Sequence, residues 1–230
     1  MADNVHKGHR QRVREKFLRE GLDVFEPHEA LELMLYYAVP YKDTNPMAHK
    51  LLEQFGSISS IFDAKPEYLR QLGYSDNVIS LIKLIPQINR LYMTDKSLVK
   101  DKTVNFNELG EYFMPRFYGR SEETLYLLLT DFKDRELYSG VISKGSINST
   151  DVPLRRILEL SLSYNAKCAV LAHNHPRGSI LPSSKDLDTT ALICESLKNI
   201  NVRLLDHIIL NDNEYFSLAN SRFAKRIFSR

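Results

Sequence analysis

Residues 166–190 constrain the fold of this chain more than any other stretch. An apolar run at 168–172 predicts a buried strand, which leads directly into a His-Asn-His string at 173–175. Side chains two positions apart on a strand point to the same side, so the two imidazoles face one point. Three residues that break regular structure follow and predict a tight loop: Pro176, Gly178 and Pro182.

A helix is expected behind this loop, and its first turn supplies a carboxylate. Ser183 is the predicted N-cap, and Asp186 falls in the first turn. His173, His175 and Asp186 can therefore form a three-ligand zinc site with an open fourth position. Two structural explanations compete: a chance His-x-His among seven histidines, and a capping interaction between Ser183 and Asp186. The combination of all these features, with ten residues between His175 and Asp186, favours the metal site.

These residues carry a family resemblance. His173-x-His175-x(10)-Asp186, with a serine three positions before the aspartate, resembles the motif of the JAMM (MPN-plus) metallopeptidase-like domain. The wider string His-Asn-His-Pro-x-Gly, followed by Leu-Asp-His-Ile-Ile at 205–209, resembles the bacterial RadC branch of that group, traditionally labelled DNA repair proteins. The resemblance covers most of the chain and is most specific around 166–210. It implies a Zn²⁺ ion and a mixed sheet flanked by helices, with a cytidine-deaminase-like architecture.

The rest of the chain fits an α/β protein in two parts. Residues 7–95 carry a run of short helical patterns, with a helix at 78–92 expected to be interrupted or kinked near Pro86. The polar segment 94–103 marks a boundary, which gives a small all-helical domain at 1–97 and the JAMM-type α/β domain at 98–230. The elements expected in the second domain are helices at 108–115, 152–164 and 183–198 and strands at 125–129, 136–143, 202–210 and 215–218.

The helical domain raises the question of a nucleic-acid partner. Gly73-Tyr74-Ser75-Asp76 lies between two helical patterns, where the RadC resemblance places a helix-hairpin-helix module. Ser75 replaces the second glycine that such a phosphate-binding turn uses. The formal net charge of +2 neither demands nor excludes a polyanion. Nucleic-acid binding through this domain is therefore an open alternative.

Composition indicates a reduced, cytoplasmic environment without a membrane. Cys168 and Cys194 each fall inside an expected strand or helix, and neither belongs to a CxxC pair. No apolar stretch approaches the roughly 20 residues of a transmembrane helix, and the first residues are polar, so we expect neither a membrane span nor a signal peptide.

The JAMM resemblance also implies residues beyond the ligands. A glutamate near the start of the first core strand acts as general base, and the register favours Glu123 over Glu122. Ser183 is placed near the developing oxyanion, although an N-cap role would compete for its hydroxyl. We expect His207 to be a core or edge histidine outside the site. Arg155 lies at 152–155, where the sequence departs from the RadC pattern His-Pro-Arg-Glu, which affects substrate fit or partner contacts.

Three functions remain after these observations. The favoured one is a zinc-dependent JAMM-type hydrolase that cleaves a peptide or isopeptide bond in a peptide or protein substrate, using a water activated by the zinc. The second is a nucleic-acid-binding protein associated with DNA repair, whose metal site is vestigial or nucleolytic. The third is a scaffold stabilised by a metal ion. No sequence pattern specifies the substrate or the oligomeric state.

Overall fold

The computed structural model describes residues 8–97, 103–145 and 153–228. The chain divides into two compact units, Met1–Ile88 and Asn89–Arg230. This division falls inside the helix α6 (Asp76–Ser97) and upstream of the polar segment 94–103. Part of that segment, residues 98–102, lies outside the described residues. The domain limits 1–97 and 98–230 therefore stay a prediction.

The first unit is helical, as the sequence predicted. Its elements before α6 are α1 (His9–Glu20), α2 (Pro27–Leu35), α3 (Asn45–Phe55), α4 (Ile58–Asp63) and α5 (Pro66–Gln71). A proline stands in the first turn of α2, α3 and α5, where its missing N–H has no partner to lose. Each helix from α2 to α6 contributes a fully buried side chain to one core, in chain order Leu35, Leu51, Ile61, Leu69 and Ile82.

The helix α6 runs without interruption from Asp76 to Ser97, so the interruption expected near Pro86 is wrong, and the alternative of a kink there stays a prediction. A proline removes one hydrogen bond of the helical ladder, and the buried contacts of Val78, Ile79 and Ile82 hold the preceding turns in place. α6 is 22 residues long. Neither it nor any other helix in the described part of the chain is both long and apolar enough to cross a membrane.

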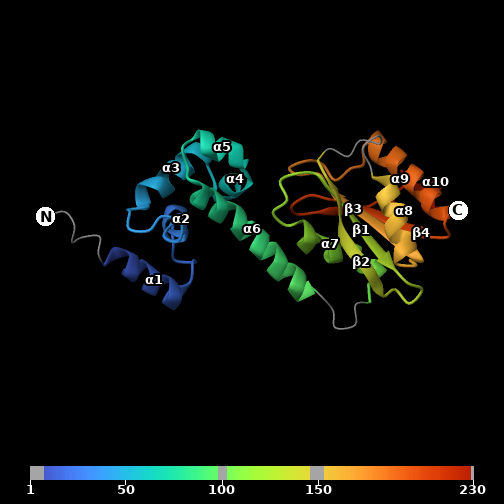
Figure 1. The fold of residues 1–230 in the computed structure, drawn as a ribbon, viewed down its shortest axis with the longest axis horizontal. Coiled ribbons are helices and arrows are strands. Elements are labelled where there is room, and N and C mark those ends of the chain that lie inside the picture. Colours follow the sequence, from blue (N-terminus) through green and yellow to red (C-terminus); the bar gives the residue numbers. More distant parts are fainter. Residues whose placement is uncertain (1–7, 98–102, 146–152, 229–230) are drawn as a thin grey trace. The chain divides into compact units, whose positions relative to one another are not determined.

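The second unit is built on a mixed sheet (Figure 1). Its strands are β1 (Thr124–Thr130), β2 (Glu136–Lys144), β3 (Cys168–Asn174), β4 (Arg203–Leu210) and β5 (Tyr215–Ser217). Among the described residues these five lie in the order β2-β1-β3-β4-β5. β1 is antiparallel to both of its neighbours, β3 and β4 are parallel, and β5 returns antiparallel to β4. The strand that carries the His-Asn-His string is therefore central.

Helices cover both faces of this sheet. They are α7 (Leu109–Phe117), which follows the 3₁₀ turn η1 (Phe106–Glu108), α8 (Leu154–Ser163), α9 (Ser184–Lys198) and the short α10 (Lys225–Phe228). Leu127 and Leu171 pack with α8 and α9 on one face. Leu128 and Val170 pack with Phe113 of α7 on the other. This alternation of buried residues confirms the α/β class and leaves a helical layer on each side.

Two boundaries in the second unit differ from the sequence prediction by more than one residue. α7 continues through Pro115 to Phe117, because Phe113 and Phe117 are both buried against the sheet and hold the last turn. α8 begins at Leu154, and Val152, where the helix was expected to start, lies outside the described residues.

Candidate metal centre

The last two side chains of β3, His173 and Asn174, lie on opposite faces of the sheet. His173 continues the row of Ala169 and Leu171, which faces α8 and α9, and it is fully buried. Asn174 turns to the opposite face by the period of two. His173 is paired in register with Leu125 of β1, so the residues just before β1 lie beside it. This pairing explains how a glutamate far upstream reaches the histidines.

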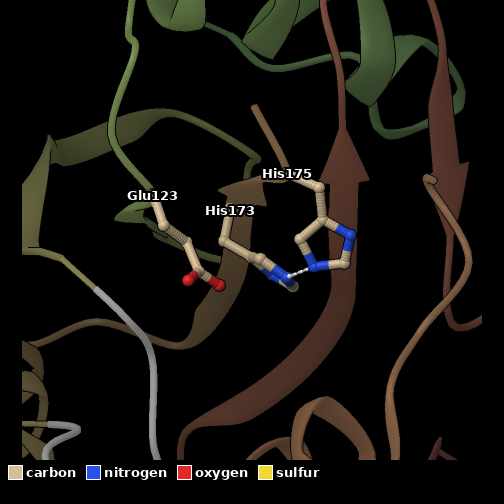
Figure 2. Close-up of side chains that lie close together, drawn as sticks. All are labelled: Glu123, His173 and His175. Atoms are coloured by element: carbon tan, nitrogen blue, oxygen red, sulfur yellow. Dashed lines mark hydrogen bonds between the residues drawn. The ribbon is translucent and has the colours of Figure 1, made fainter. Parts of the chain in front are cut away.

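Four side chains converge at this end of the sheet. The Nε2 atoms of His173 and His175 are 2.8 Å apart. Oδ1 of Asp186 lies 3.3 Å from Nε2 of His173, and Oδ2 lies 3.7 Å from Nε2 of His175. Donor atoms of Glu123, His173 and His175 all lie within 4.8 Å of one another, so this group could hold a metal ion. In Figure 2 the Glu123 carboxylate and the His175 ring lie on either side of the His173 ring.

These separations fit zinc. Zinc accepts histidine nitrogen at about 2.0–2.1 Å, so two ligands at the corners of a tetrahedron stand about 3.3 Å apart. The distances of 2.8, 3.3 and 3.7 Å among His173, His175 and Asp186 lie around this value. Two imidazoles with carboxylates are also a donor set typical of zinc. The residues present therefore fit the ion that the sequence predicted.

His175 stands where the strand gives way to the loop. Its backbone N–H donates to the carbonyl of Leu210 at the end of β4, and its own carbonyl accepts from Gly178. Its Nδ1 lies 2.6 Å from the carbonyl oxygen of Ser179. A carbonyl oxygen only accepts, so Nδ1 of His175 carries the proton and Nε2 presents a lone pair to the site.

Asp186 is held in place by the helix cap. Ser183 is the N-cap of α9, and the capping box is complete: its Oγ accepts the N–H of Asp186, whose carboxylate accepts the N–H of Ser183. The Ser183 hydroxyl also donates to Oδ2 of Asp186 at 2.7 Å. Burial alone raises the pKa of Asp186, but hydrogen bonds and charge from His173, together with the Ser183 hydrogen bonds, outweigh it and hold the pKa below its usual range. Asp186 is thus a carboxylate at neutral pH.

The predicted site residues thus lie close together. Asp186 takes part in the helix cap and is also the predicted ligand. Asp188, two residues further along the same helix, is exposed. The Ser183 hydroxyl is engaged in the cap, and its oxyanion role stays a prediction. Arg155 is exposed and forms a surface ion pair with Glu159.

Glu123 is positioned by a residue that the sequence analysis did not select. The side chain of Asn174 accepts the N–H of Thr124 at 2.8 Å and donates to the carbonyl of Glu122 at 3.2 Å. From the other side, the N–H of Gly145 donates to the backbone carbonyl of Glu123 at 2.8 Å. A polar side chain at the end of an apolar strand was the signal for this role, because a buried amide needs partners.

His207 was expected to be a core or edge histidine, and in the structure it also contacts one of the predicted ligands. It is a core histidine, buried on β4, where it pairs in register with Leu171 of β3. Its Nε2, however, lies 2.7 Å from Nδ1 of His173, and its Nδ1 lies 2.6 Å from the hydroxyl of Thr190. Burial, followed by the charge of His173, lowers the pKa of His207 well below its usual value. The parallel pairing of β3 and β4 brings it against His173, and this pairing cannot be derived from local sequence.

The fold and the donor group define an α/β domain with a potential metal site between the end of a central strand and the start of a helix. Residues 103–223 match the family described as "RadC-like JAB domain". The UPF0758 protein FN0909 of Fusobacterium nucleatum is 33% identical over 225 residues, which cover 94% of this chain and 97% of that protein. A UPF0758 protein of Pseudomonas syringae pv. tomato is 30% identical over 210 residues, covering 90% and 93%. The chain belongs to the RadC family.

Proposed function

We propose that this protein is a zinc-dependent hydrolase of the JAMM type that cleaves a peptide or isopeptide bond in a peptide or protein substrate. One observation carries the proposal: Glu123, His173 and His175 bring donor atoms within 4.8 Å of one another, with Asp186 against both histidines. Such a cluster in a RadC-like JAB domain supports hydrolysis over a purely structural role. Nucleic-acid binding remains the alternative function.

The roles of the side chains follow from their surroundings. His173, His175 and Asp186 would hold the ion, since each is fixed by neighbouring contacts and presents a donor atom to one point. When bound, zinc supplies a Lewis acid that polarises an amide carbonyl and lowers the pKa of a water molecule. Glu123 is less buried than His173 and Asp186, as suits a carboxylate that must exchange protons with a substrate-filled site.

In this proposal the Glu123 carboxylate takes the proton of the attacking water and returns it to the leaving amine. General acid–base catalysis of this kind contributes about 10²–10⁴-fold. Ser183, at the start of α9, would donate to the oxygen that becomes negative as the tetrahedral centre forms. To do so its hydroxyl must leave Oδ2 of Asp186, which still keeps the backbone N–H of Ser183.

The first experiment is metal analysis of the purified full chain together with an unbiased peptide-cleavage screen, with and without a chelator. We expect zinc in the protein and cleavage that the chelator abolishes. The variant Glu123→Gln should keep its zinc and lose turnover by about 10²–10⁴-fold, because the amide keeps the size of the side chain but lacks a basic oxygen.

Glu122→Gln is the matched control. Glu122 is exposed and contributes its backbone carbonyl, not its side chain, to the contact with Asn174. Its substitution should leave both zinc content and turnover unchanged. Loss of zinc in Glu123→Gln would make Glu123 a ligand, and full activity in that variant would reject it as the base. Cleavage insensitive to chelation would reject the zinc mechanism.

A further inference from the structure

A chain of three hydrogen bonds runs behind the candidate metal centre. It begins at the backbone carbonyl oxygen of Asp186, which lies 2.5 Å from Oγ1 of Thr190 one helical turn further along α9. Oγ1 of Thr190 lies 2.6 Å from Nδ1 of His207, and Nε2 of His207 lies 2.7 Å from Nδ1 of His173. Thr190, His207 and His173 are all buried. The chain therefore joins the backbone of one predicted ligand to the ring of another.

The position of each proton follows from the first bond. A carbonyl oxygen only accepts, so the single hydroxyl proton of Thr190 points to Asp186. The hydroxyl oxygen must then accept a hydrogen bond from His207, so Nδ1 of His207 carries the proton. A second proton on His207 would make it a cation in an apolar interior, at a large desolvation cost. Nε2 of His207 is therefore an acceptor, and Nδ1 of His173 donates to it.

We propose that Thr190 and His207 are positioning residues that hold His173 in the tautomer whose Nε2 presents a lone pair to the metal. The inference rests on the metal centre proposed above and adds two residues that touch neither ion nor substrate. A ligand histidine whose second ring nitrogen is anchored keeps its orientation and gains basicity. The usual anchor is a carboxylate or a carbonyl, and here a second histidine takes that place.

The same arrangement accounts for the close approach of the two ligand rings. Nε2 of His175 is also unprotonated, because Nδ1 donates to the carbonyl of Ser179. Two lone pairs 2.8 Å apart repel each other unless a cation lies between them. The two rings, each anchored through Nδ1, thus form a site for a cation.

Three substitutions at two adjacent threonines test this hydrogen-bond relay. Thr190→Val keeps the shape of the side chain and removes the hydroxyl, which leaves His207 free to reverse its tautomer. Thr190→Ser keeps the hydroxyl. Thr189→Val is the matched control, because the Thr189 hydroxyl is buried on the same helix and has no hydrogen-bond partner among the described residues. We expect the zinc affinity of the full chain, measured by competition with a chromophoric chelator, to fall about 10–100-fold in Thr190→Val and to hold in the other two.

A second pair of variants acts on the middle of the relay. His207→Gln places an amide oxygen where it can accept from His173 and should retain most of the zinc affinity. His207→Leu removes the acceptor and should lose it to the same degree as Thr190→Val. Thermal unfolding of the zinc-free proteins shows whether each variant folds. If Thr190→Val does not fold, the two His207 variants still test the inference.

The tautomer itself is measured with zinc bound. In the zinc-loaded full chain, long-range ¹H–¹⁵N spectra should show the proton of His173 on Nδ1, with Nε2 left to the metal. The opposite tautomer overturns the inference, as does Thr190→Val or His207→Leu with wild-type zinc affinity while His173→Ala has lost zinc. A wild-type chain that binds no zinc, or a His173→Ala chain that still binds it, overturns the proposed metal centre as well.

Discussion

The side chain of Asn174 accepts a hydrogen bond from the backbone N–H of Thr124 across 50 residues of sequence, at 2.8 Å. The same amide donates to the carbonyls of Glu122 and Arg120, at 3.2 and 3.3 Å. These contacts fall on both sides of Glu123, the predicted base. The residue between the two predicted ligand histidines in sequence therefore positions the predicted base from the opposite face of the sheet.

We expect Asn174→Ala to lower the free energy of unfolding by about 1–3 kcal/mol, because the buried N–H of Thr124 and the partly buried carbonyls of Glu122 and Arg120 lose their partner. Zinc should remain bound, since Asn174 faces away from the predicted ligands. Turnover should fall, because the backbone that positions Glu123 loses its hydrogen bonds. Urea unfolding and zinc content measure the two effects. Asn174→Asp is the comparison, because it keeps the acceptor for Thr124 and loses the donor. An Asn174→Ala chain as stable as the wild type would contradict this role.

Zinc should stabilise the folded chain against heat. A ligand that binds only the native state adds about 2.7 kcal/mol at a free concentration 100 times its Kd, and a chelator removes this gain. We expect His173→Ala and Asp186→Ala to abolish the zinc-induced rise in Tm. His49→Ala is the control, because His49 stacks on His28 in the first unit. Thermal unfolding with one equivalent of zinc measures the shift, and unchanged responses in both ligand variants would reject the assignment.

Ser183→Ala separates the cap from catalysis. Loss of an N-cap side chain costs about 0.5–2 kcal/mol of unfolding free energy. Asp186 keeps the backbone N–H of Ser183, at 2.7 Å, so zinc should stay bound. Turnover beyond the stability effect should fall if the hydroxyl also donates to the oxyanion. Ser183→Thr, which retains a hydroxyl, should recover the stability. If Ser183→Ala unfolds as the wild type does, the cap contributes nothing.

Any affinity for DNA should be weak and should fall steeply with salt. In the turn before α6, the N–H groups of Gly73 and Tyr74 donate to the carbonyls of Arg70 and Leu69 at the end of α5. These two N–H groups are therefore not available to bind a phosphate. Titration of a labelled duplex at two salt concentrations measures the slope. Tight, sequence-selective binding at physiological salt would instead favour nucleic-acid binding over hydrolysis.

The basic residues of α1 support the same expectation. Arg10 donates to the carbonyls of Val39 and Lys42, and Lys16 lies 3.6 Å from Glu29. These cations are engaged in contacts within the first unit, so a phosphate would have to compete for them.

Local patterns were enough to predict the strand, the loop and the helix that carry the candidate ligands. Alternation along β3, continued one residue past its end, places His173 and His175 on one side, and the cap signal at Ser183 fixes where α9 begins. Both signals act within a few residues, where the chain leaves little freedom. At Pro86 and Pro115 the local pattern predicted a break or an end of the helix, but both helices continue through the proline. Burial of neighbouring side chains outweighs the single hydrogen bond that a proline removes.

The supporting residues could not be predicted in this way. His207 meets His173 across 34 residues and Thr190 across 17, through the parallel register of β3 and β4 and the docking of α9. A one-residue slip in the register of β3 and β4 would turn His207 to the other face. Sequence periodicity determines which side chains share a face of one strand, but not which residues of two strands stand opposite each other.

The pairing of Leu125 with His173 sets an order of events during folding. The donor atoms come from the segment before β1, from the end of β3 and from α9, so they meet only after distant strands have paired and the helix has docked. Pairing between segments so far apart in sequence is a slow step. A metal ion cannot act here as the template for folding, as it does in small zinc-dependent domains. In the proposed function the nascent chain would acquire its ion last, and the supply of zinc would limit the loaded fraction of the protein rather than its yield of folded chains.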